Sequence, residues 1–470
     1  MYSIIKTIYN YINICYHINN FYYVAQKKEV NDDDITNFIN KIIPSVKYCG
    51  CICIKFCQWL TPILENVYTD ITNTDKKWLT ILEQFYENCS EQSVIYTLQT
   101  YKNDFGENLY DKYEIINVIG TGSIGQVYKI QEKTSGDFFA LKVIHPTCKY
   151  DMWLFKLILH ILLYIPYTNK IIYDIIPYDI PQFMNVFEEQ LDMIHEANNL
   201  CKFKYNYKDN TKIIIPDLIK CSHNILVMSY EEGTTFDNIN KSEYEKMKLA
   251  VIFYLFGRNN FEQLNFNHAD LHKGNWKIST NDKIVIYDFG YCFTIKNTNI
   301  IKYLHTAFTD TDYEKGHSDF KKLVIEIIED YSDETYQYIS EYLEEEVHKD
   351  HTLADPQLLL KHIFNVTKHL RIKLNPVSIQ SIIIQIQNLK YLTNYSLNNK
   401  NEKHQTGYFV YRRDYLNYYS ICKTYNIFPK LQVYFKDILN EKQVEVNGIF
   451  DMLNEKTEIT NEIKNLLIFD

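Results

Sequence analysis

Apolar positions recur at mixed spacings of three and four residues across residues 1–110, and no glycine-rich turn interrupts them. That spacing is typical of amphipathic helices, so this stretch is predicted to be a helical extension. The pattern changes at Asp111. Three short runs rich in β-branched and aromatic residues follow, and runs of this kind predict the strands of a small sheet. The runs are Glu114–Gly120, Gln126–Gln131 and Phe138–Ile144.

Helical periodicity then returns and continues to about Lys204. Two more strands are predicted at Lys212–Ile215 and Asn224–Tyr230, with a turn at Pro216 between them. The rest of the pattern is mostly helical, broken by loops near residues 265–295.

A small sheet followed by a helical lobe predicts a two-lobed α+β fold like that of a protein kinase. The predicted parts are a helical extension (1–110), a sheet-bearing lobe (111–235) with an insertion at 150–185, a helical lobe (236–397) and a helical tail (398–470).

Composition limits the partners and the location of the chain. The net charge is −10 and no basic patch dominates, so nucleic acid is not an expected partner. No run of about 20 apolar residues is present, so a membrane-spanning helix is not expected. Met1–Ala25 fits neither a signal peptide nor a transit peptide. The expectation is an intracellular protein, either soluble or peripheral to a membrane, and Met152–Tyr167 is predicted to be a buried or interfacial helix.

The 11 cysteines are expected to be reduced. Cys49, Cys53 and Cys57 would share one face of a helix. Their spacing fits no common zinc pattern, so small apolar packing residues are favoured over a metal site.

The first motif with candidate chemistry is the glycine-rich stretch Gly120–Val127, GTGSIGQV. It matches the phosphate-binding loop of kinases, in which glycines bring backbone N–H groups against phosphate oxygens. A dinucleotide-binding turn has similar spacing, but it opens a helix, whereas strands follow here. Lys142 in the third predicted strand matches the kinase lysine that holds the α- and β-phosphates of ATP. The expected ATP contacts are Gly120, Gly122, Ser123, Gly125, Val127, Lys142, Met228 and Tyr230.

The second motif places catalytic and metal-binding residues at kinase spacing. Residues 267–275 read NHADLHKGN, and residues 284–290 read IVIYDFG. Asp270 is predicted to be catalytic, accepting the proton of a substrate hydroxyl. Asn275 and Asp288 are predicted to hold the Mg²⁺ or Mn²⁺ that bridges the ATP phosphates.

Several stretches resemble the UbiB/ADCK family of atypical kinases more than ordinary protein kinases. These are KFCQ at 55–58, SIGQV at 123–127, KVIHP at 142–146, QLDMIHEANN at 190–199 and HADLHKGN at 268–275. The set is specific in combination. The resemblance implies an ATP-dependent kinase or ATPase that is linked to lipid or quinone metabolism at a membrane surface.

The resemblance also implies a catalytic ion pair between Lys142 and Glu196. The two residues are 54 positions apart (196 − 142), farther than in an ordinary kinase, and the family carries an insertion at this point. Residues 152–181 are predicted to be that insertion. The alternative for Glu196 is a solvated charge on a helix surface.

The resemblance also implies a regulatory role for four further residues. Lys55 and Gln58 match the family's K-x-G-Q signature, while Gln190 and Asp192 match the acidic positions of its E-x-D. The helix with Lys55 and Gln58 is predicted to pack across the mouth of the nucleotide site. Lys55 would then pair with Asp192, and the Gln58 amide would donate to the backbone of residues 120–123. The alternative is that Lys55 extends to solvent and the helix packs elsewhere.

The chain departs from the family pattern in ways that affect the expected activity. Gly120 and Gly122 stand in a loop that is usually alanine-rich in the family. Lys273 replaces a proline, Gln190 a glutamate and Cys57 a glycine. The A-P-E segment that supports a protein substrate is absent after the D-F-G triplet, which argues against ordinary protein phosphorylation.

The leading hypothesis is therefore an atypical ATP-dependent phosphotransferase or ATPase, with a lipid-like or quinone-like small molecule as partner. A small-molecule kinase of the aminoglycoside or choline type is the enzymatic alternative. A nucleotide-binding pseudokinase scaffold is the third hypothesis, disfavoured because all the usual catalytic positions are filled.

Overall fold

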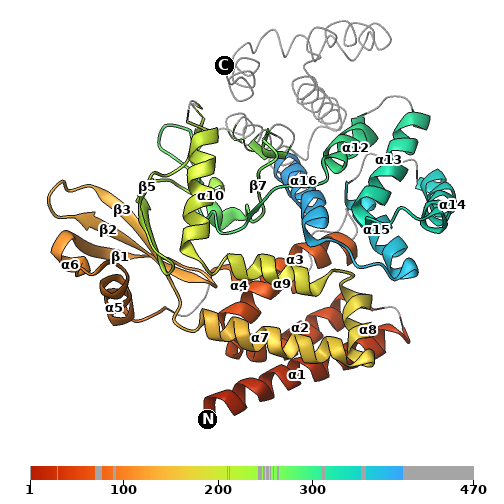
Figure 1. Ribbon diagram of the computed structural model, residues 1–470, viewed down its shortest axis with the longest axis horizontal. Coiled ribbons are helices and arrows are strands. Elements are labelled where there is room, and N and C mark those ends of the chain that lie inside the picture. The colour runs from red at the N-terminus through yellow and green to blue at the C-terminus, as the bar shows by residue number, and fades with distance from the viewer. Residues whose placement is uncertain are drawn as a thin grey trace, which may run out of the picture. The chain divides into compact units, whose positions relative to one another are not determined.

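The protein is described by a computed structural model that covers residues 2–394, apart from positions 29, 69–76, 88–90, 209, 211, 242–245, 247–248, 250–252, 254–255, 258, 262–263, 310–312 and 351–355. These residues form two compact units (Figure 1). The first unit contains residues 1–201, 216–230 and 367–373. The second contains residues 202–215, 231–366 and the described residues from 374 onward.

The first unit begins with helices, as predicted for the extension. They are α1 (Tyr2–Ala25), α2 (Asp32–Tyr48), α3 (Cys51–Tyr68), α4 (Lys77–Glu87), α5 (Val94–Phe105) and α6 (Leu109–Lys112). Asn31 caps α2, because its side chain accepts from the N–H of Asp34 while the Asp34 carboxylate accepts from the N–H of Asn31. In this unit α1 packs on α2, and α3 packs on α4.

An antiparallel sheet follows, with the strand order β1-β2-β3-β6-β5. Its strands are β1 (Tyr113–Thr121), β2 (Gly125–Glu132), β3 (Phe138–Ile144), β5 (Leu218–Cys221) and β6 (Ile225–Ser229). The three strands predicted first are confirmed to within a few residues. The prediction was incomplete after residue 215, since β5 was missed in the stretch assigned to a turn at Pro216.

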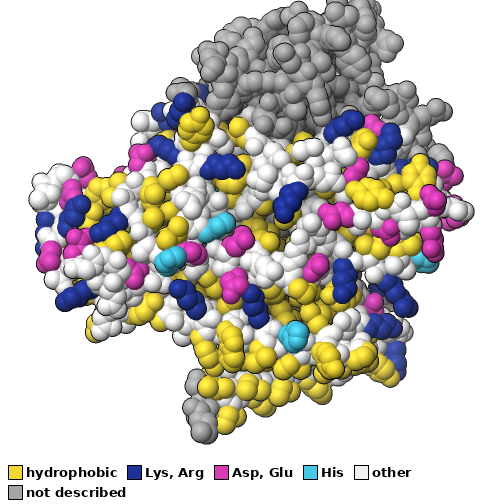
Figure 2. Space-filling view, in the orientation of Figure 1, with side chains coloured by type: hydrophobic (Ala, Val, Ile, Leu, Met, Phe, Trp, Pro, Cys, Tyr) yellow, Lys and Arg dark blue, Asp and Glu magenta, His cyan; other side chains and the backbone are white. Residues whose placement is uncertain are grey.

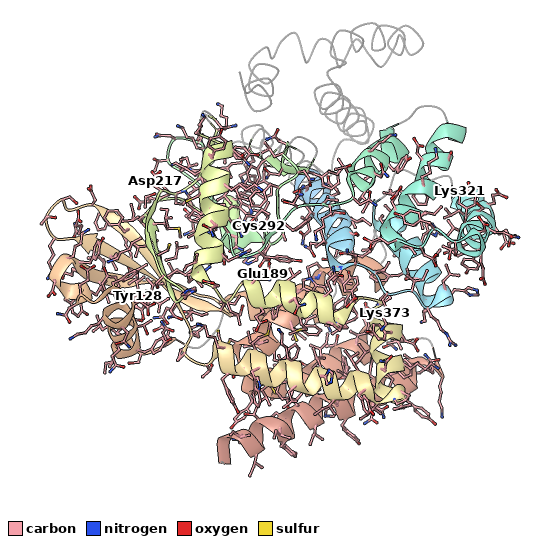
Figure 3. The ribbon with its side chains drawn as sticks, in the orientation of Figure 1. Tyr128, Glu189, Asp217, Cys292, Lys321 and Lys373 are labelled. Carbon is pink, nitrogen blue, oxygen red and sulfur yellow. The ribbon has the colours of Figure 1, made fainter. Side chains whose placement is uncertain are left out.

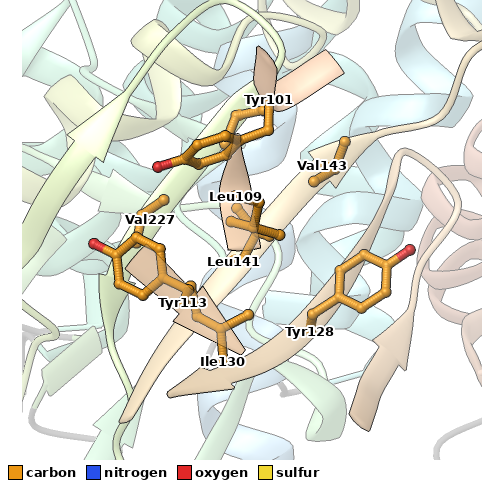
Figure 4. Close-up of a cluster of buried hydrophobic side chains, with 9 residues drawn as sticks. Tyr101, Leu109, Tyr113, Tyr128, Ile130, Leu141, Val143 and Val227 are labelled. Carbon is orange, nitrogen blue, oxygen red and sulfur yellow. The ribbon is translucent and has the colours of Figure 1, made fainter. Parts of the chain in front are cut away.

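The core of this unit lies where α5 and α6 cover one face of the sheet (Figure 4). Alternate residues of the strands point into it, as expected for a sheet with one buried face. Tyr128, also labelled in Figure 3, is fully buried, and its hydroxyl lies 2.9 Å from the Thr97 hydroxyl. The buried cluster is Tyr101, Leu109, Tyr113, Tyr128, Ile130, Leu141, Val143, Ile225 and Val227.

Three helices fill the predicted insertion between β3 and the next long helix. They are α7 (Cys148–Tyr164), α8 (Pro166–Ile175) and α9 (Ile180–Glu189), and α10 (Met193–Asn206) follows them. One side of α7 faces the interior of the unit and carries the buried residues Cys148, Met152 and Phe155. No helix among the described residues is long and apolar enough to cross a membrane.

The second unit combines short strands with helices. Its small strands are β4 (Ile213–Ile214), β7 (Asn267–His268), β8 (Trp276–Ile278), β9 (Ile284–Ile286) and β10 (Cys292–Phe293). The 3₁₀ turns are Phe236–Asn238 and Lys273–Asn275. The helices after them are α12 (Thr298–Thr309), α13 (Tyr313–Ile328), α14 (Asp333–Asp350), α15 (Pro356–Leu370) and α16 (Pro376–Asn394).

The strand predicted at residues 212–215 is real but does not join the main sheet. It is β4, which pairs in parallel with β9, and β9 also pairs with β8. β9 is the apolar strand predicted directly before the D-F-G triplet. The predicted helical tail, residues 398–470, lies outside the described residues.

Candidate functional site

The predicted site residues fall into two groups that occupy separate units. The turn site consists of the Gly120–Gly125 turn with Lys142 and Glu196 in the first unit. The loop site consists of Asp270, Asn275 and Asp288 in the second unit.

The turn site is built on the hairpin between β1 and β2. Thr121 pairs with Gln126, so residues 122–124 form the turn, and Gly122 N–H donates to Gly125 O at 3.0 Å. Gly125 is required by packing, because a Cβ there would lie 2.7 Å from Val143 O. A Cβ at Gly120, by contrast, would meet no described atom within 4 Å. Packing therefore does not require a glycine at position 120.

The turn also offers unused hydrogen-bond donors. Within the described part of the chain, the backbone N–H groups of Ser123 and Ile124 have no acceptor. Successive free N–H groups at a glycine-rich turn form an anion-binding site. The residues present thus fit a phosphate group, while their contact with ATP stays a prediction.

His145 forms hydrogen bonds with two carbonyl groups of this turn. Its N–H donates to Ile124 O at 2.9 Å, and its Nε2 donates to Gly122 O at 2.9 Å. Its Nδ1 lies 3.1 Å from the Gln92 side-chain amide. Burial lowers the pKa of His145, against the smaller raising effect of its bond to Gly122. These contacts were missed from the sequence, although His145 stands within the KVIHP stretch that carried the family resemblance.

Lys142 and Glu196 form the predicted ion pair. Lys142 lies in β3, opposite Val127 of β2 and Leu226 of β6. Its Nζ donates to both Glu196 carboxylate oxygens at 2.8 Å. The two side chains are 9% and 1% exposed, so the alternative of a solvated helix charge at Glu196 is wrong. In this buried setting each charge compensates the desolvation of the other.

The extension reaches the turn through α3. The Ser123 hydroxyl donates to Gln58 Oε1 at 3.0 Å, and both residues are buried. The prediction that Gln58 contacts the turn is confirmed, but the hydrogen bond runs in the opposite direction to the predicted one. Gln58 accepts from a side-chain hydroxyl, whereas the sequence predicted that its amide donates to the backbone.

The predicted partner of Lys55 was wrong. Asp192 caps α10 by accepting from the N–H of Ile194 at 2.9 Å, and both of its carboxylate oxygens lie 3.1 Å from His223 Nδ1. The turn between β5 and β6 brings His223 to this carboxylate. Gln190, the other E-x-D position, is buried directly after α9.

Met228 and Tyr230 lie at the end of β6 and beyond it. Met228 is buried and pairs with Ala140 of β3. Tyr230 donates its N–H to Phe138 O at 3.2 Å, and the Lys129 ammonium lies 4.3 Å from the centre of its ring. Their contact with a nucleotide stays a prediction.

In the second unit, His268 organises the loop site. It is 2% exposed, and burial lowers its pKa below the usual 6.5, against raising effects of the nearby Asp270 and Asp288 carboxylates. The Asp270 N–H donates to Nδ1 at 3.3 Å, and Nε2 lies 3.3 Å from Tyr287 O. Both contacts fit a neutral imidazole with its proton on Nε2. His268 therefore joins the backbone at Asp270 to the backbone just before Asp288.

Asn275 presents an oxygen to the loop site. Its Nδ2 donates to Asp270 O at 2.7 Å, which fixes the side-chain amide. Its Oδ1 has no partner within the described ranges. An amide oxygen together with a carboxylate is a ligand set that suits Mg²⁺, which binds protein through one or two carboxylates and completes its shell with phosphates and water.

Asp288 supplies that carboxylate from an uncommon backbone conformation. Its φ is +54°, in the left-handed region, and its Oδ1 accepts from the Gly290 N–H at 3.2 Å. Phe289 is fully buried, with its ring centroid 5.3 Å from that of Phe203 and 5.6 Å from that of His268. Such conformations persist where the surroundings hold them, and they cluster at functional sites.

Gln380 on α16 supports the same loop and was also missed. Its Nε2 donates to Ala269 O at 3.0 Å in a buried position. No local pattern in the sequence connects these two residues, which are 111 positions apart.

A glycine turn between strands, a strand lysine paired with a helix glutamate, and an Asp–Asn loop before a D-F-G triplet define a protein-kinase-like fold. Residues 82–318, half of the chain, match the ABC1 atypical kinase-like domain. The chain therefore belongs to the ABC1 atypical kinase-like family, and the UbiB/ADCK resemblance is confirmed.

Individual relatives agree with this membership. The chain is 27% identical over 252 residues to the probable serine/threonine-protein kinase abkC of Dictyostelium discoideum, covering 51% of this chain and 35% of that protein. It is 31% identical over 179 residues to the chloroplastic protein ACTIVITY OF BC1 COMPLEX KINASE 3 of Arabidopsis thaliana, covering 37% and 25%. The chain thus spans about a third or less of the length of these two relatives.

A solved structure, the complex of Rv3197 with erythromycin from Mycobacterium tuberculosis, is similar with a TM-score of 0.40 and 15% identity. The match covers 70% of this chain and 88% of that chain. A TM-score this low supports no conclusion about function.

Removing either member of the Lys142–Glu196 pair should destabilise the fold by about 3–5 kcal/mol, because the remaining charge stays buried without its partner. The double variant Lys142→Ala/Glu196→Ala should lose less than the sum of the single variants. Urea unfolding measures all three. Lys321→Ala, which breaks the exposed Lys321–Glu344 pair, is the control and should change stability little. Additive losses at Lys142 and Glu196 would contradict the coupling.

The lowered pKa of His268 predicts a pH dependence of stability. The unfolded chain takes up this proton near pH 6.5, and the folded chain only at lower pH, so stability should fall as the pH drops below about 6.5. His268→Gln should flatten part of this slope in thermal melts. His160→Gln, at an exposed position on α7, is the matched variant for comparison. A wild-type slope that His268→Gln does not alter would show that His268 is not buried as a neutral side chain.

Proposed function

We propose that this chain is an ATP-dependent atypical kinase or ATPase that uses Mg²⁺ or Mn²⁺ to transfer or hydrolyse the γ-phosphate of ATP. The observation that supports this most strongly is the buried ion pair in which Glu196 holds the Lys142 ammonium in β3. The free N–H groups of the Gly120–Gly125 turn add a second set of donors for phosphate oxygens.

Each site residue has a distinct role in this proposal. Lys142 and the turn bind and orient the phosphates. Asn275 and Asp288 hold the metal ion, which would neutralise the charge that develops on the phosphoryl group. Asp270 takes the proton of the acceptor oxygen as that oxygen bonds to the γ-phosphorus and the bond to the ADP oxygen breaks.

We also assign the acceptor to a small class of molecules: a lipid-like or quinone-like hydroxyl compound, with water as the alternative. The contact of Gln58 with Ser123 supports this choice, because it seats α3 of the extension directly on the phosphate turn. A helix at this position leaves less room for a protein substrate than an uncovered turn does.

A small-molecule kinase of the aminoglycoside or choline type is less well supported. The Gln58–Ser123 contact joins a residue of the K-x-G-Q-like motif to the phosphate turn, and that motif belongs to the UbiB/ADCK pattern. A pseudokinase scaffold is disfavoured because Lys142, Glu196, Asp270, Asn275 and Asp288 all keep reactive side chains.

The proposal predicts metal-dependent nucleotide binding and turnover by the purified chain. ATP with Mg²⁺ or Mn²⁺ should raise the melting temperature, since a ligand at a hundred times its Kd adds about 2.7 kcal/mol to stability. γ-Phosphate release or transfer should then be measured with and without lipid or quinone analogues.

Asp288→Asn is the matched variant, since it keeps the size of the side chain and removes the charge that binds the metal. It should lower turnover by about a hundredfold or more while the fold stays intact. A chain that shows neither a thermal shift at millimolar nucleotide nor turnover with either metal would refute the proposal. A thermal shift without turnover would favour the pseudokinase scaffold.

A further inference from the structure

His145 connects three segments that meet at the Gly120–Gly125 turn. It directly follows β3, and its backbone N–H donates to Ile124 O at 2.9 Å. Its carbonyl oxygen accepts from the N–H of Cys148, the first residue of α7, at 3.2 Å. Its ring lies against the turn itself, with Nε2 2.9 Å from Gly122 O. A single residue at the end of β3 therefore holds two carbonyl groups of the turn and the start of α7.

The ring of His145 has a defined protonation state. A carbonyl oxygen can only accept a hydrogen bond, so the ring proton lies on Nε2. Burial lowers the pKa of His145 below the usual 6.5, so the ring is neutral near pH 7. Nδ1 lies 3.1 Å from the side-chain amide of Gln92, and the Gln92 N–H donates to Gln126 Oε1 at 2.7 Å. Gln126 is fully buried in β2, so the far side of the ring is also held in place.

The bond to Gly122 O decides where the next backbone donor points. The peptide between Gly122 and Ser123 is trans, and the C=O and N–H of a trans peptide point in opposite directions. Because His145 holds Gly122 O, the Ser123 N–H points away from the ring. The Ser123 hydroxyl is bonded to Gln58, and this N–H has no acceptor among the described residues. A glycine at position 122 restrains the peptide little by itself, so the histidine supplies the restraint.

Oriented donors matter in this chain because it is acidic. The net charge is −10, and on the face that Figure 2 shows, Lys and Arg side chains are interspersed with Asp and Glu side chains. A surface of mixed charge does not draw in a polyphosphate by itself. Affinity for phosphates then depends on Lys142 and on a few N–H groups that are held in the right direction. A turn that loses this direction should lose affinity for phosphates specifically.

We propose that His145 is a positioning residue for the phosphate turn, and that its Nε2–H bond to Gly122 O aims the Ser123 N–H at the phosphates of ATP. This inference rests on the proposed function, because ATP is the ligand. His145 acts through Gly122 and not on the ligand itself, and it takes no part in the proton transfer assigned to Asp270. Loss of the bond should weaken phosphate binding and leave the binding of the nucleoside unchanged.

The test compares the dissociation constants of ATP with Mg²⁺ and of adenosine, measured by calorimetry on the full chain. A glutamine amide reaches the position of Nε2, whereas the shorter asparagine amide reaches only that of Nδ1. His145→Gln should therefore keep ATP binding within about threefold of the wild type, while His145→Asn and His145→Leu should weaken it about tenfold by leaving Gly122 O without its donor. All of these proteins should bind adenosine equally. His160→Asn, at an exposed position on α7, is the control and should bind ATP as the wild type does.

The outcomes separate this role from the proposed function. A wild-type chain that binds no ATP would refute the proposed function, and the positioning role with it. If the wild type binds ATP, two results would overturn the positioning role alone. The first is that the Gln and Asn variants retain or lose ATP binding equally. The second is that the variants lose ATP and adenosine binding to the same extent, which would show that His145 only maintains the fold.

Hydrogen exchange gives a second measurement that needs no variant. The wild-type peptide that covers residues 120–127 should exchange its amide hydrogens more slowly once ATP is bound, because the Ser123 N–H then donates to a phosphate oxygen. Adenosine should not slow this exchange. Exchange at Ser123 that stays unchanged when ATP binds would also overturn the proposal.

Discussion

The ion pair between Lys142 and Glu196 is the interaction on which the rest of the first unit depends. It joins the central strand of the sheet to the first turns of α10, and it does so in a setting where neither charge could remain alone. The pair constrains what lies around it. The insertion α7–α9 must return the chain so that α10 begins beside the sheet, and the Asp192 cap fixes where α10 starts. In the proposed function, the lysine held in this way binds the ATP phosphates.

In the second unit, buried hydrogen bonds fix the backbone around the loop site. His268 accepts from one loop and donates to another through a neutral ring, Asn275 is tied to the backbone of Asp270, and Gln380 holds the carbonyl of Ala269. These contacts fix the backbone that carries the Asn275 amide and the Asp288 carboxylate. Both units therefore use buried polar contacts to fix the backbone near the residues with chemical roles. Positioning of this kind accounts for most of what a phosphotransfer enzyme contributes.

The sequence was informative where chemistry depends on short-range spacing. The glycine turn, the Asp270–Asn275 interval and the strand before Asp288 could all be predicted because each lies within a few residues of chain. β5 was missed, since four residues beside a proline give no clear alternation. Contacts between distant segments also escaped prediction. Asp192 pairs with His223 rather than Lys55 because the β5–β6 turn brings that histidine to it, and Gln380 reaches Ala269 only through the packing of α16.

The most direct measurement of the central claim is labelling with an ATP analogue whose terminal phosphate carries a reactive acyl group, which acylates a lysine amine at the phosphates. Peptide mapping should find Lys142 as the labelled lysine, and excess ATP with Mg²⁺ should prevent the labelling. Glu196→Ala should reduce it, because the ammonium would no longer be held in place. Labelling that is confined to other lysines, or that ATP does not prevent, would contradict the account.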